Sequence, residues 1–352
     1  MIGIIFCNTL GMCPYADKYI DACRKLNIPY EVIIWDRSGG NVDYPHNFKV
    51  FREKSDVYTS KWNKIGAFLR FRRFLKKAIR ESQYEKLIML TTLPAILCYS
   101  ELKKRYQGKY IFDFRDMSFE QYGFYNKLVG NICDNAAFTC ISSPGFAEVL
   151  GKKDYIIANN FRYSDIEHAA ERMKSLSEPI RLLNIGVSRG EMFNRALVDA
   201  FGNDDRFSVH IVGMGNDTPS FMNYVKQYSN IHVVGTYNNE EKKQYIQQAD
   251  MLLYYYPCSF NCNVALANKY YDGLIFKKPL IGNMNTYSGR RLVEKQIGIS
   301  LDLKDQTFAD QVYAYMKTLN EEKYLYAARE ELNQILSEDS IYLDHINQFL
   351  NM

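Results

Sequence analysis

The stretch NIHVVGTYNNEEKKQYIQQADMLLYYYP (230–257) contains a strand, a turn, a helix and a second strand in succession. An apolar run ends at Gly235, a polar turn and a charged helical segment follow, and a second apolar run begins after Asp250. Strands that are apolar on both faces and separated by helices are typical of a parallel sheet covered on both sides. The stretch therefore predicts an α/β fold.

The same alternation extends in both directions from this stretch. Strands are expected at 1–6, 30–35, 86–91, 109–114, 137–142 and 154–158, and again at 180–186, 207–213, 231–235, 249–256, 279–282 and 297–303. A polar segment (159–179) interrupts the pattern, and helical patterns at 305–319, 321–336 and about 339–350 close the chain. The sequence predicts two Rossmann-like domains whose parallel sheets face a ligand cleft, joined by a linker near 159–179.

The composition excludes several classes of protein. A net charge of only +4 over 352 residues does not indicate a nucleic-acid-binding protein. The eight Cys form no Cys-x-x-Cys pair, so we expect reduced thiols and no structural zinc. The N-terminus lacks the basic region of a signal peptide, and no segment approaches the roughly 20 apolar residues of a membrane span. We expect a cytoplasmic protein.

Glycines stand where several strands of the second half end. NIGVSRG has Gly186 followed by Arg189, and VHIVGMGND has Gly213 and Gly215. Glycine lets backbone N–H groups approach a phosphate, and a helix N-terminus that follows adds about half a positive charge. Tight turns are the alternative explanation for each of these glycines.

The segment ANKYYDGLIFKKPLIG (267–282) places Lys269 and Asp272 three residues apart in front of a buried strand. We expect a short helix here, with Asp272 on its opening turn. The pair could be a surface ion pair worth under about 1 kcal/mol, or an acid that favours the helix dipole. A pocket for a sugar nucleotide is the functional interpretation.

In the first half, KYIFDFRD runs out of a strand into a loop and carries Asp113 and Asp116. A carboxylate at a strand end is a candidate base for an acceptor hydroxyl. Asp113 could instead pair with Arg115 or cap a helix.

The order of these features resembles that of GT-B-fold glycosyltransferases, family-4-like, of the kind found in capsular, exopolysaccharide and lipopolysaccharide biosynthesis. In that family an Arg or Lys after the first glycine strand meets the donor pyrophosphate, which Arg189 matches. Lys269 falls on the family's Lys, and Asp272 on the Glu that holds the nucleotide ribose. FDFRDMS is similar to the D-x-R-D motif on the acceptor side.

The resemblance implies an acceptor-side domain over 1–165, a donor domain over 179–338, and a last helix (about 339–352) that packs back on the first domain. It also implies an enzyme that moves a sugar from a nucleoside-diphosphate sugar to a growing, lipid-linked surface polysaccharide at the inner face of the membrane. No Asp-x-Asp motif stands in a metal-binding context, so the leaving group needs cations and N–H groups instead. Arg189, Lys269 and the helix start near Asn263–Asn268 are the candidates.

The chain departs from the family pattern at Val264, eight residues before Asp272, where the family has a second Glu. Three alternatives therefore stay open: a GT-B-fold nucleotide-sugar epimerase, a degenerate transferase homologue that only binds, and a two-lobed solute-binding protein.

A basic, aromatic-rich helical pattern, KWNKIGAFLRFRRFLKKAIR, spans 61–80. Its apolar stripe is expected at Ile65, Phe68, Leu69, Leu75 and Ile79. Such a helix suits peripheral contact with anionic lipid, or packing on its own sheet with a solvated basic face.

Overall fold

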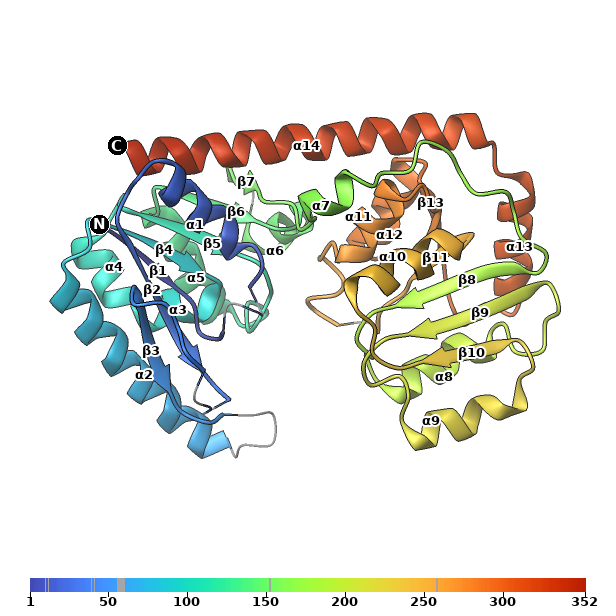
Figure 1. Ribbon diagram of the computed structural model, residues 1–352, viewed down its shortest axis with the longest axis horizontal. Coiled ribbons are helices and arrows are strands. Elements are labelled where there is room, and N and C mark those ends of the chain that lie inside the picture. Colours follow the sequence, from blue (N-terminus) through green and yellow to red (C-terminus); the bar gives the residue numbers. More distant parts are fainter. Residues whose placement is uncertain are drawn as a thin grey trace. The chain divides into compact units, whose positions relative to one another are not determined.

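The computed structural model describes residues 1–9, 11, 13–38, 40, 42–55, 61–151, 153–257 and 259–352. The chain divides into two compact units, one made of Met1–Asn159 with Ser337–Met352 and the other of Asn160–Leu336. In Figure 1 each unit is a sheet with helices on both of its faces.

The first unit contains a seven-stranded parallel sheet in the order β3-β2-β1-β4-β5-β6-β7. The strands are β1 (Ile2–Ile5), β2 (Tyr30–Asp36), β3 (Phe48–Arg52), β4 (Lys86–Leu90), β5 (Tyr110–Phe114), β6 (Phe138–Ile141) and β7 (Ile156–Ile157). The sequence did not predict β3, because FKVFR is short, carries two cations and lies at the sheet edge, where half-buried positions give a weak apolar signal.

Helices cover both faces of this sheet. They are α1 (Ala16–Lys25), α2 (Lys61–Ser82), α3 (Thr92–Leu97), α4 (Tyr99–Arg105), α5 (Gly123–Asn135) and α6 (Ala147–Leu150). The core on one face combines α1 with Tyr342, Ile346 and Phe349 near the C-terminus. The opposite face holds α2, whose Phe71 packs on Trp35 of β2 with ring centroids 5.1 Å apart.

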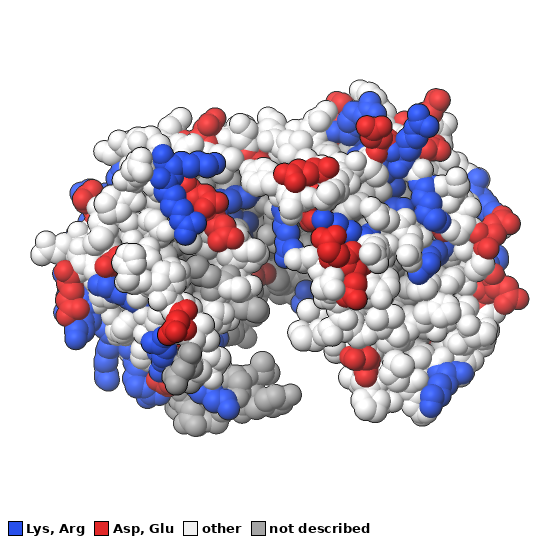
Figure 2. Space-filling view, viewed as in Figure 1, with Lys and Arg blue, Asp and Glu red and all other residues white. Residues whose placement is uncertain are grey.

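The apolar stripe expected on α2 is largely part of this core. Leu75 and Ile79 are fully buried, whereas Ile65 and Leu69 are about half exposed, at 50% and 49%. Figure 2 shows Lys and Arg side chains gathered over α2. The helix thus packs on its own sheet and turns a basic face to solvent, with Ile65 and Leu69 partly exposed.

The second unit contains a six-stranded parallel sheet in the order β10-β9-β8-β11-β12-β13. The strands are β8 (Ile180–Ile185), β9 (Phe207–Val212), β10 (Ile231–Val234), β11 (Met251–Tyr254), β12 (Leu280–Asn283) and β13 (Gly298–Leu301). Counted within the unit, the strands run 3-2-1-4-5-6, the doubly wound Rossmann order, as the first six do in the other sheet. Two parallel α/β sheets, as predicted from the sequence, are confirmed.

The helices of the second unit also form two layers. They are α7 (Tyr163–Ile166), α8 (Glu191–Asp199), α9 (Pro219–Tyr224), α10 (Asn239–Gln248), α11 (Asn268–Ile275), α12 (Tyr287–Glu294), α13 (Phe308–Thr318) and α14 (Glu321–Asn351). Cores under α8, α9 and α13 and under α10, α11, α12 and α14 lie on opposite faces of the sheet. The segment expected as a linker is part of this unit, because Phe161, Ile166 and Met173 pack into its core.

The last helix, α14, is continuous, whereas the sequence predicted two helices with a break near 337–338. The polar stretch SEDS (337–340) stays helical because its acids have partners: Asp339 accepts a bond from Lys18, and Glu338 one from Asn159. Ala328, Leu332 and Ile335 join the core of the second unit, and Tyr342, Ile346 and Phe349 that of the first. One helix therefore belongs to both units.

Seven described cysteines are free thiols; six are buried and Cys262 is partly exposed. Burial raises the pKa of Cys23 and of Cys133 to about 11, which keeps both protonated near neutral pH. Among the described residues no group of three potential ligands could hold a metal ion. In the same part of the chain no helix has the length and apolar character needed to cross a bilayer.

Candidate functional site

The candidate site lies at the carboxyl edge of the second sheet, where the strand order changes direction between β8 and β11. Ligands of doubly wound folds bind at such a switch point. Gly186 follows β8 with φ +131°, and Gly213 follows β9 with φ +135°. A Cβ on Gly213 would lie 2.0 Å from the Gly186 carbonyl oxygen, so only glycine allows the two strand ends to approach this closely.

The glycine amides do not have the role expected from the sequence. The Gly186 N–H donates to the Val212 carbonyl at 2.9 Å, and the Gly213 N–H donates to those of Val234 and Gly235 at 3.0 and 2.9 Å. Both amides are thus bound within the sheet and are not directed at a phosphate. Their glycines serve close packing at the sheet edge.

Two loops after β8 and β9 are fastened to each other by polar bonds. The Asn216 side-chain amide donates to the Gly186 carbonyl at 3.1 Å, and the Asn194 amide to the Asn216 Oδ1 at 2.8 Å. The Ser188 N–H donates to the Met214 carbonyl at 2.9 Å. Gly215, at φ +79°, supplies the turn conformation that this arrangement needs. The loops that carry Gly186, Arg189 and Gly215 are therefore preorganised.

Lys269 lies across the switch point. It is 6% exposed, and its Nζ donates to Asn184 Oδ1 on β8 and to the Leu253 carbonyl on β11, the latter at 3.0 Å. The Nζ also lies 5.0 Å from the centre of the Tyr256 ring. Burial, with a smaller contribution from nearby Arg189, lowers the pKa of Lys269 to about 7, while Asp272 opposes the shift. A half-charged lysine at neutral pH is poised to respond to an anion.

Asp272 lies on the second turn of α11, not on its opening turn as expected, because the helix begins at Asn268. Its carboxylate is 4% exposed and accepts a bond from Lys242 Nζ at 2.7 Å. Burial raises the pKa of Asp272, and the charge of Lys242 opposes that shift. The side chain is buried, is paired with Lys242 and lies beyond the first turn. The two structural alternatives, an exposed ion pair with Lys269 and an acid that favours the helix dipole, therefore do not describe Asp272.

Arg189 brings a second cation to the same place. Its guanidinium lies 5.3 Å from the centre of the Tyr256 ring, the ring that Lys269 also faces, and the side chain is exposed. Three predicted residues, Arg189, Lys269 and Asp272, are therefore gathered around Tyr256 and β11. Arg195, a further arginine near this strand end, lies on α8 and donates to Glu191 and Ser220.

Asn263 stands in the loop between β11 and α11. Its side chain is exposed, and its backbone carbonyl accepts a bond from the Tyr287 N–H at 2.7 Å. The neighbouring Val264 is 7% exposed, so an apolar side chain is buried where the resembling family has its second Glu.

Lys242 is a site residue that the sequence did not reveal. It lies on α10, 30 positions before its partner Asp272. A capping box of Asn238 and Glu241 fixes the start of that helix. In the sequence, Lys242 is recognisable only as a lysine one turn after the helix cap. Many surface helices have a lysine there, so this position does not indicate a site residue.

In the first unit Asp113 is part of a buried ion pair. The carboxylate is 0% exposed and accepts bonds from Arg115 Nε at 2.5 Å and Nη2 at 2.9 Å, and from the Tyr19 hydroxyl at 2.8 Å. Arg115 in turn donates to the Ala158 carbonyl at 2.7 Å. This matches the structural alternative for Asp113, because no oxygen of the carboxylate is left to face a ligand.

Asp116 is exposed in the loop that follows β5, so the structure separates the two acids. Glu120, four residues further, is 2% exposed and was not singled out in the sequence. Its Oε2 accepts the Ser118 N–H at 2.5 Å, while Oε1 is buried with no hydrogen-bond partner within the described structure. Burial raises the pKa of Glu120, and neighbouring backbone N–H groups oppose the shift.

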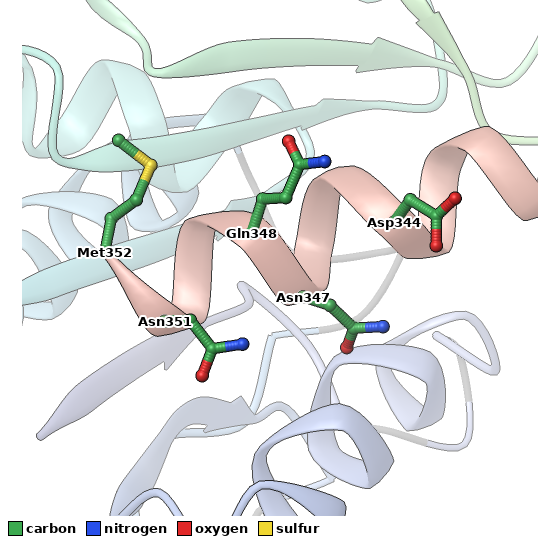
Figure 3. A pocket seen from close by; sticks show the side chains of 5 residues that line it. All are labelled: Asp344, Asn347, Gln348, Asn351 and Met352. Atoms are coloured by element: carbon green, nitrogen blue, oxygen red, sulfur yellow. The ribbon is translucent and has the colours of Figure 1, made fainter.

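A surface hollow in the first unit is lined by the end of α14 and the residue that follows it. Asp344, Asn347, Gln348 and Asn351 of the helix and Met352 beyond it surround the hollow, as Figure 3 shows. None of them was a predicted site residue. Concavity by itself therefore does not mark the candidate site.

Comparison with known proteins identifies the fold. No family model and no curated protein matches the chain. Among solved structures, it is similar to sucrose-phosphate synthase from Thermosynechococcus elongatus, with a TM-score of 0.69 and 12% identity over 99% of both chains. The chain has the GT-B fold.

Other solved structures agree. A glycosyltransferase from Rickettsia africae gives a TM-score of 0.63 and 14% identity over 99% of this chain and 98% of its own. WaaG, a glycosyltransferase involved in lipopolysaccharide biosynthesis, gives 0.59 and 11% over 98% and 95%. At these identities the likeness concerns the fold, and at that level the expected resemblance to GT-B glycosyltransferases is confirmed.

Proposed function

We propose that this chain is a glycosyltransferase that moves a sugar from a nucleoside-diphosphate sugar to a growing glycan. The observation that carries the proposal is Lys269, a buried cation that bridges β8 and β11 at the switch point, with Asp272 one turn further along α11. Both lie where a GT-B donor domain is expected to bind its nucleotide.

The charges fit a diphosphate leaving group. Lys269 Nζ and the Arg189 guanidinium lie 5.0 and 5.3 Å from the centre of the Tyr256 ring, near the sheet edge where we propose that an anion binds. Cations placed there stabilise the charge that develops on a departing diphosphate. In this proposal they do so without a metal ion.

Asp272 has the chemistry for the other end of the nucleotide. A carboxylate accepts two ribose hydroxyls at once, and Lys242 supports it in the charged form. We propose that Asp272 binds the ribose and that Asp116, in the loop after β5, assists the acceptor hydroxyl. The acceptor is proposed to be a surface glycan, lipid-linked and reached at the inner face of the cell membrane.

Val264 supports a second candidate, a homologue that binds the donor without turnover. Its buried apolar side chain leaves no carboxylate at that point of the loop. Binding of the donor and its turnover, which releases nucleoside diphosphate, therefore need separate measurements.

The experiment is a thermal-shift panel of nucleoside diphosphates and their sugars on the wild type, Asp272→Ala and Glu240→Ala. Glu240 is an exposed acid of α10 in the same unit and serves as the matched control. We expect one nucleotide to raise the melting temperature of the wild type and of Glu240→Ala, and Asp272→Ala to lose most of that rise. If no nucleotide stabilises the wild type, the proposed function is wrong.

A further inference from the structure

The loop at 118–124, here called the aromatic loop, exposes three large rings within six residues. Phe119 is 57% exposed, Tyr122 53% and Phe124 78%. The loop lies between β5 and α5 and includes Phe124 on the first turn of α5, and its exposed rings begin three residues after Asp116. Scattered single rings are ordinary on a surface, but a cluster of this kind marks a contact site.

The rings are fixed in place before any ligand arrives. Tyr122 and Phe124 stack with centroids 6.4 Å apart and planes at 29°, and Phe119 meets the ring of Tyr125 edge-on at 5.7 Å. The Tyr122 N–H donates to the Phe119 carbonyl at 3.0 Å and closes the turn. Preorganised rings lose little conformational freedom on binding, which favours affinity.

A second observation points to a ligand at the same loop. Glu120 lies among the exposed rings in sequence but is itself 2% exposed, and its Oε1 is buried without a hydrogen-bond partner in the described part of the chain. Buried polar atoms normally have a partner, so an orphaned carboxyl oxygen calls for one. A ligand hydroxyl would satisfy it if the side chain turned outward on binding.

The chemistry of the loop favours a sugar over a lipid surface. A pyranose ring has an apolar face of C–H groups that packs on an aromatic ring, and a rim of hydroxyls that bonds to carboxylates and amides. Exposed Gln121 and Asp116 and buried Glu120 supply such polar groups. Membrane-binding segments instead carry clusters of Lys or Arg, and 116–126 has none between Arg115 and Lys127.

We propose that the aromatic loop is a carbohydrate-binding platform, on which Phe119, Tyr122 and Phe124 stack against a pyranose of the acceptor glycan and Glu120 Oε1 bonds to one of its hydroxyls. The inference rests on the proposed function and deepens it, because it assigns recognition of the acceptor to its sugar part. It also places the bound sugar next to Asp116.

The test is saturation-transfer NMR, in which the aromatic protons of the full chain are irradiated. The probes are methyl pyranosides and disaccharides of glucose, galactose, mannose and N-acetylglucosamine, each at millimolar concentration. We expect transfer to at least one sugar, with affinity reduced about threefold to tenfold by Phe119→Ala, Tyr122→Ala or Phe124→Ala. Tyr326→Ala is the matched control, since Tyr326 is 67% exposed on α14.

Glu120→Gln is the second kind of variant. The Gln oxygen remains with the Ser118 N–H, so an NH2 group replaces the orphaned carboxyl oxygen. A sugar hydroxyl can still bond to this group but loses its bond to a charged acceptor, so we expect sugar affinity to fall while the melting temperature is kept. Unchanged affinity in all four variants, or no transfer to any sugar, overturns the proposal. Ring-dependent binding to phosphatidylglycerol vesicles without sugar binding also overturns it, in favour of a membrane contact.

The same samples separate this inference from the proposed function. The nucleotide-induced thermal shift is measured on each aromatic variant, where we expect the wild-type value. A normal nucleotide shift without sugar binding means that the loop inference alone is wrong. Ring-dependent sugar binding with no nucleotide shift means that the donor function is wrong and the platform stands.

Discussion

Among single residues, Lys269 has the clearest chemical consequence. Its pKa is lowered to about 7, chiefly by burial, so near neutral pH the free site holds it partly uncharged. A bound diphosphate favours the charged form of Lys269 and raises its pKa. At a pH between the pKa of the free site and that of the bound site, binding therefore takes up a proton. The affinity of the site should therefore depend on pH.

We predict that nucleotide affinity falls as pH rises from about 7 to 9, by up to about tenfold per pH unit. Lys269→Met should bind more weakly and show almost no pH dependence. Isothermal titration in buffers of different ionisation enthalpy measures the proton uptake directly. Lys243→Met, which removes a lysine of α10 that pairs with Glu240, should retain the wild-type pH profile. Equal affinity of the wild type at pH 7 and 9 would contradict the prediction.

Part of the residue-level picture was predictable and part was not. Lys269 and Asp272 could be found because they share one short helix in front of a buried strand, so their spacing carries the signal. Lys242 and Glu120 could not, because pairing with Asp272 and burial of Glu120 arise only when distant segments or a loop fold together. The glycines were located correctly, but their amide bonds depend on neighbouring strands.

Among the elements, α14 contributes side chains to the cores of both units. Tyr342 is 0% exposed and covers the Asp113–Arg115 ion pair, with its hydroxyl 3.5 Å from Asp113 Oδ2 and its ring 5.9 Å from that of Tyr19. Removing the ring leaves a cavity beside a buried ion pair, which adds a cavity cost to the loss of apolar burial.

Tyr342→Ala should lower the free energy of unfolding by about 3–5 kcal/mol. Ile341→Ala, one residue earlier and 48% exposed, should change it by about 0.5 kcal/mol or less. Urea unfolding followed by circular dichroism compares the two. A similar cost for both variants would mean that this end of α14 does not cover the core of the first unit.

The continuity of α14 shows why helix boundaries were harder to predict than the positions of strands. The polar stretch SEDS (337–340) interrupts the apolar periodicity, and such an interruption predicts a break in the helix. Hydrogen bonds from Lys18 and Asn159 to the acidic side chains of this stretch keep it helical. The strands that the sequence shows most clearly, such as β1, β5 and β11, are apolar runs whose residues are all buried, so sequence and burial agree there. Strand β3 lacks such a run and escaped prediction.

For the whole molecule, the candidate residues divide between the two units. The donor residues Arg189, Lys269 and Asp272 all belong to Asn160–Leu336, and the acceptor candidates Asp116 and Glu120 to the unit of Met1–Asn159. Each ligand should therefore change the local dynamics of one unit only.

We predict that a nucleoside diphosphate slows amide hydrogen exchange around 186–190, 213–216 and 267–275 and leaves 113–124 unchanged. Bound ligand suppresses local opening of the segments that it contacts, which is what exchange reports. Mass spectrometry of peptides from the wild type and Asp272→Ala makes the comparison, and the variant should show little protection. Slowed exchange at 113–124 with nucleotide alone would contradict this division of roles.

The state of the cysteines gives a practical handle on that site. Among the described thiols Cys262 alone is not buried, and it lies in the loop between β11 and α11, one residue before Asn263. A thiol-reactive fluorophore should therefore attach there in preference to the buried cysteines. Its emission would follow occupancy of the neighbouring candidate site in real time and turn the chain into an optical sensor for its proposed donor.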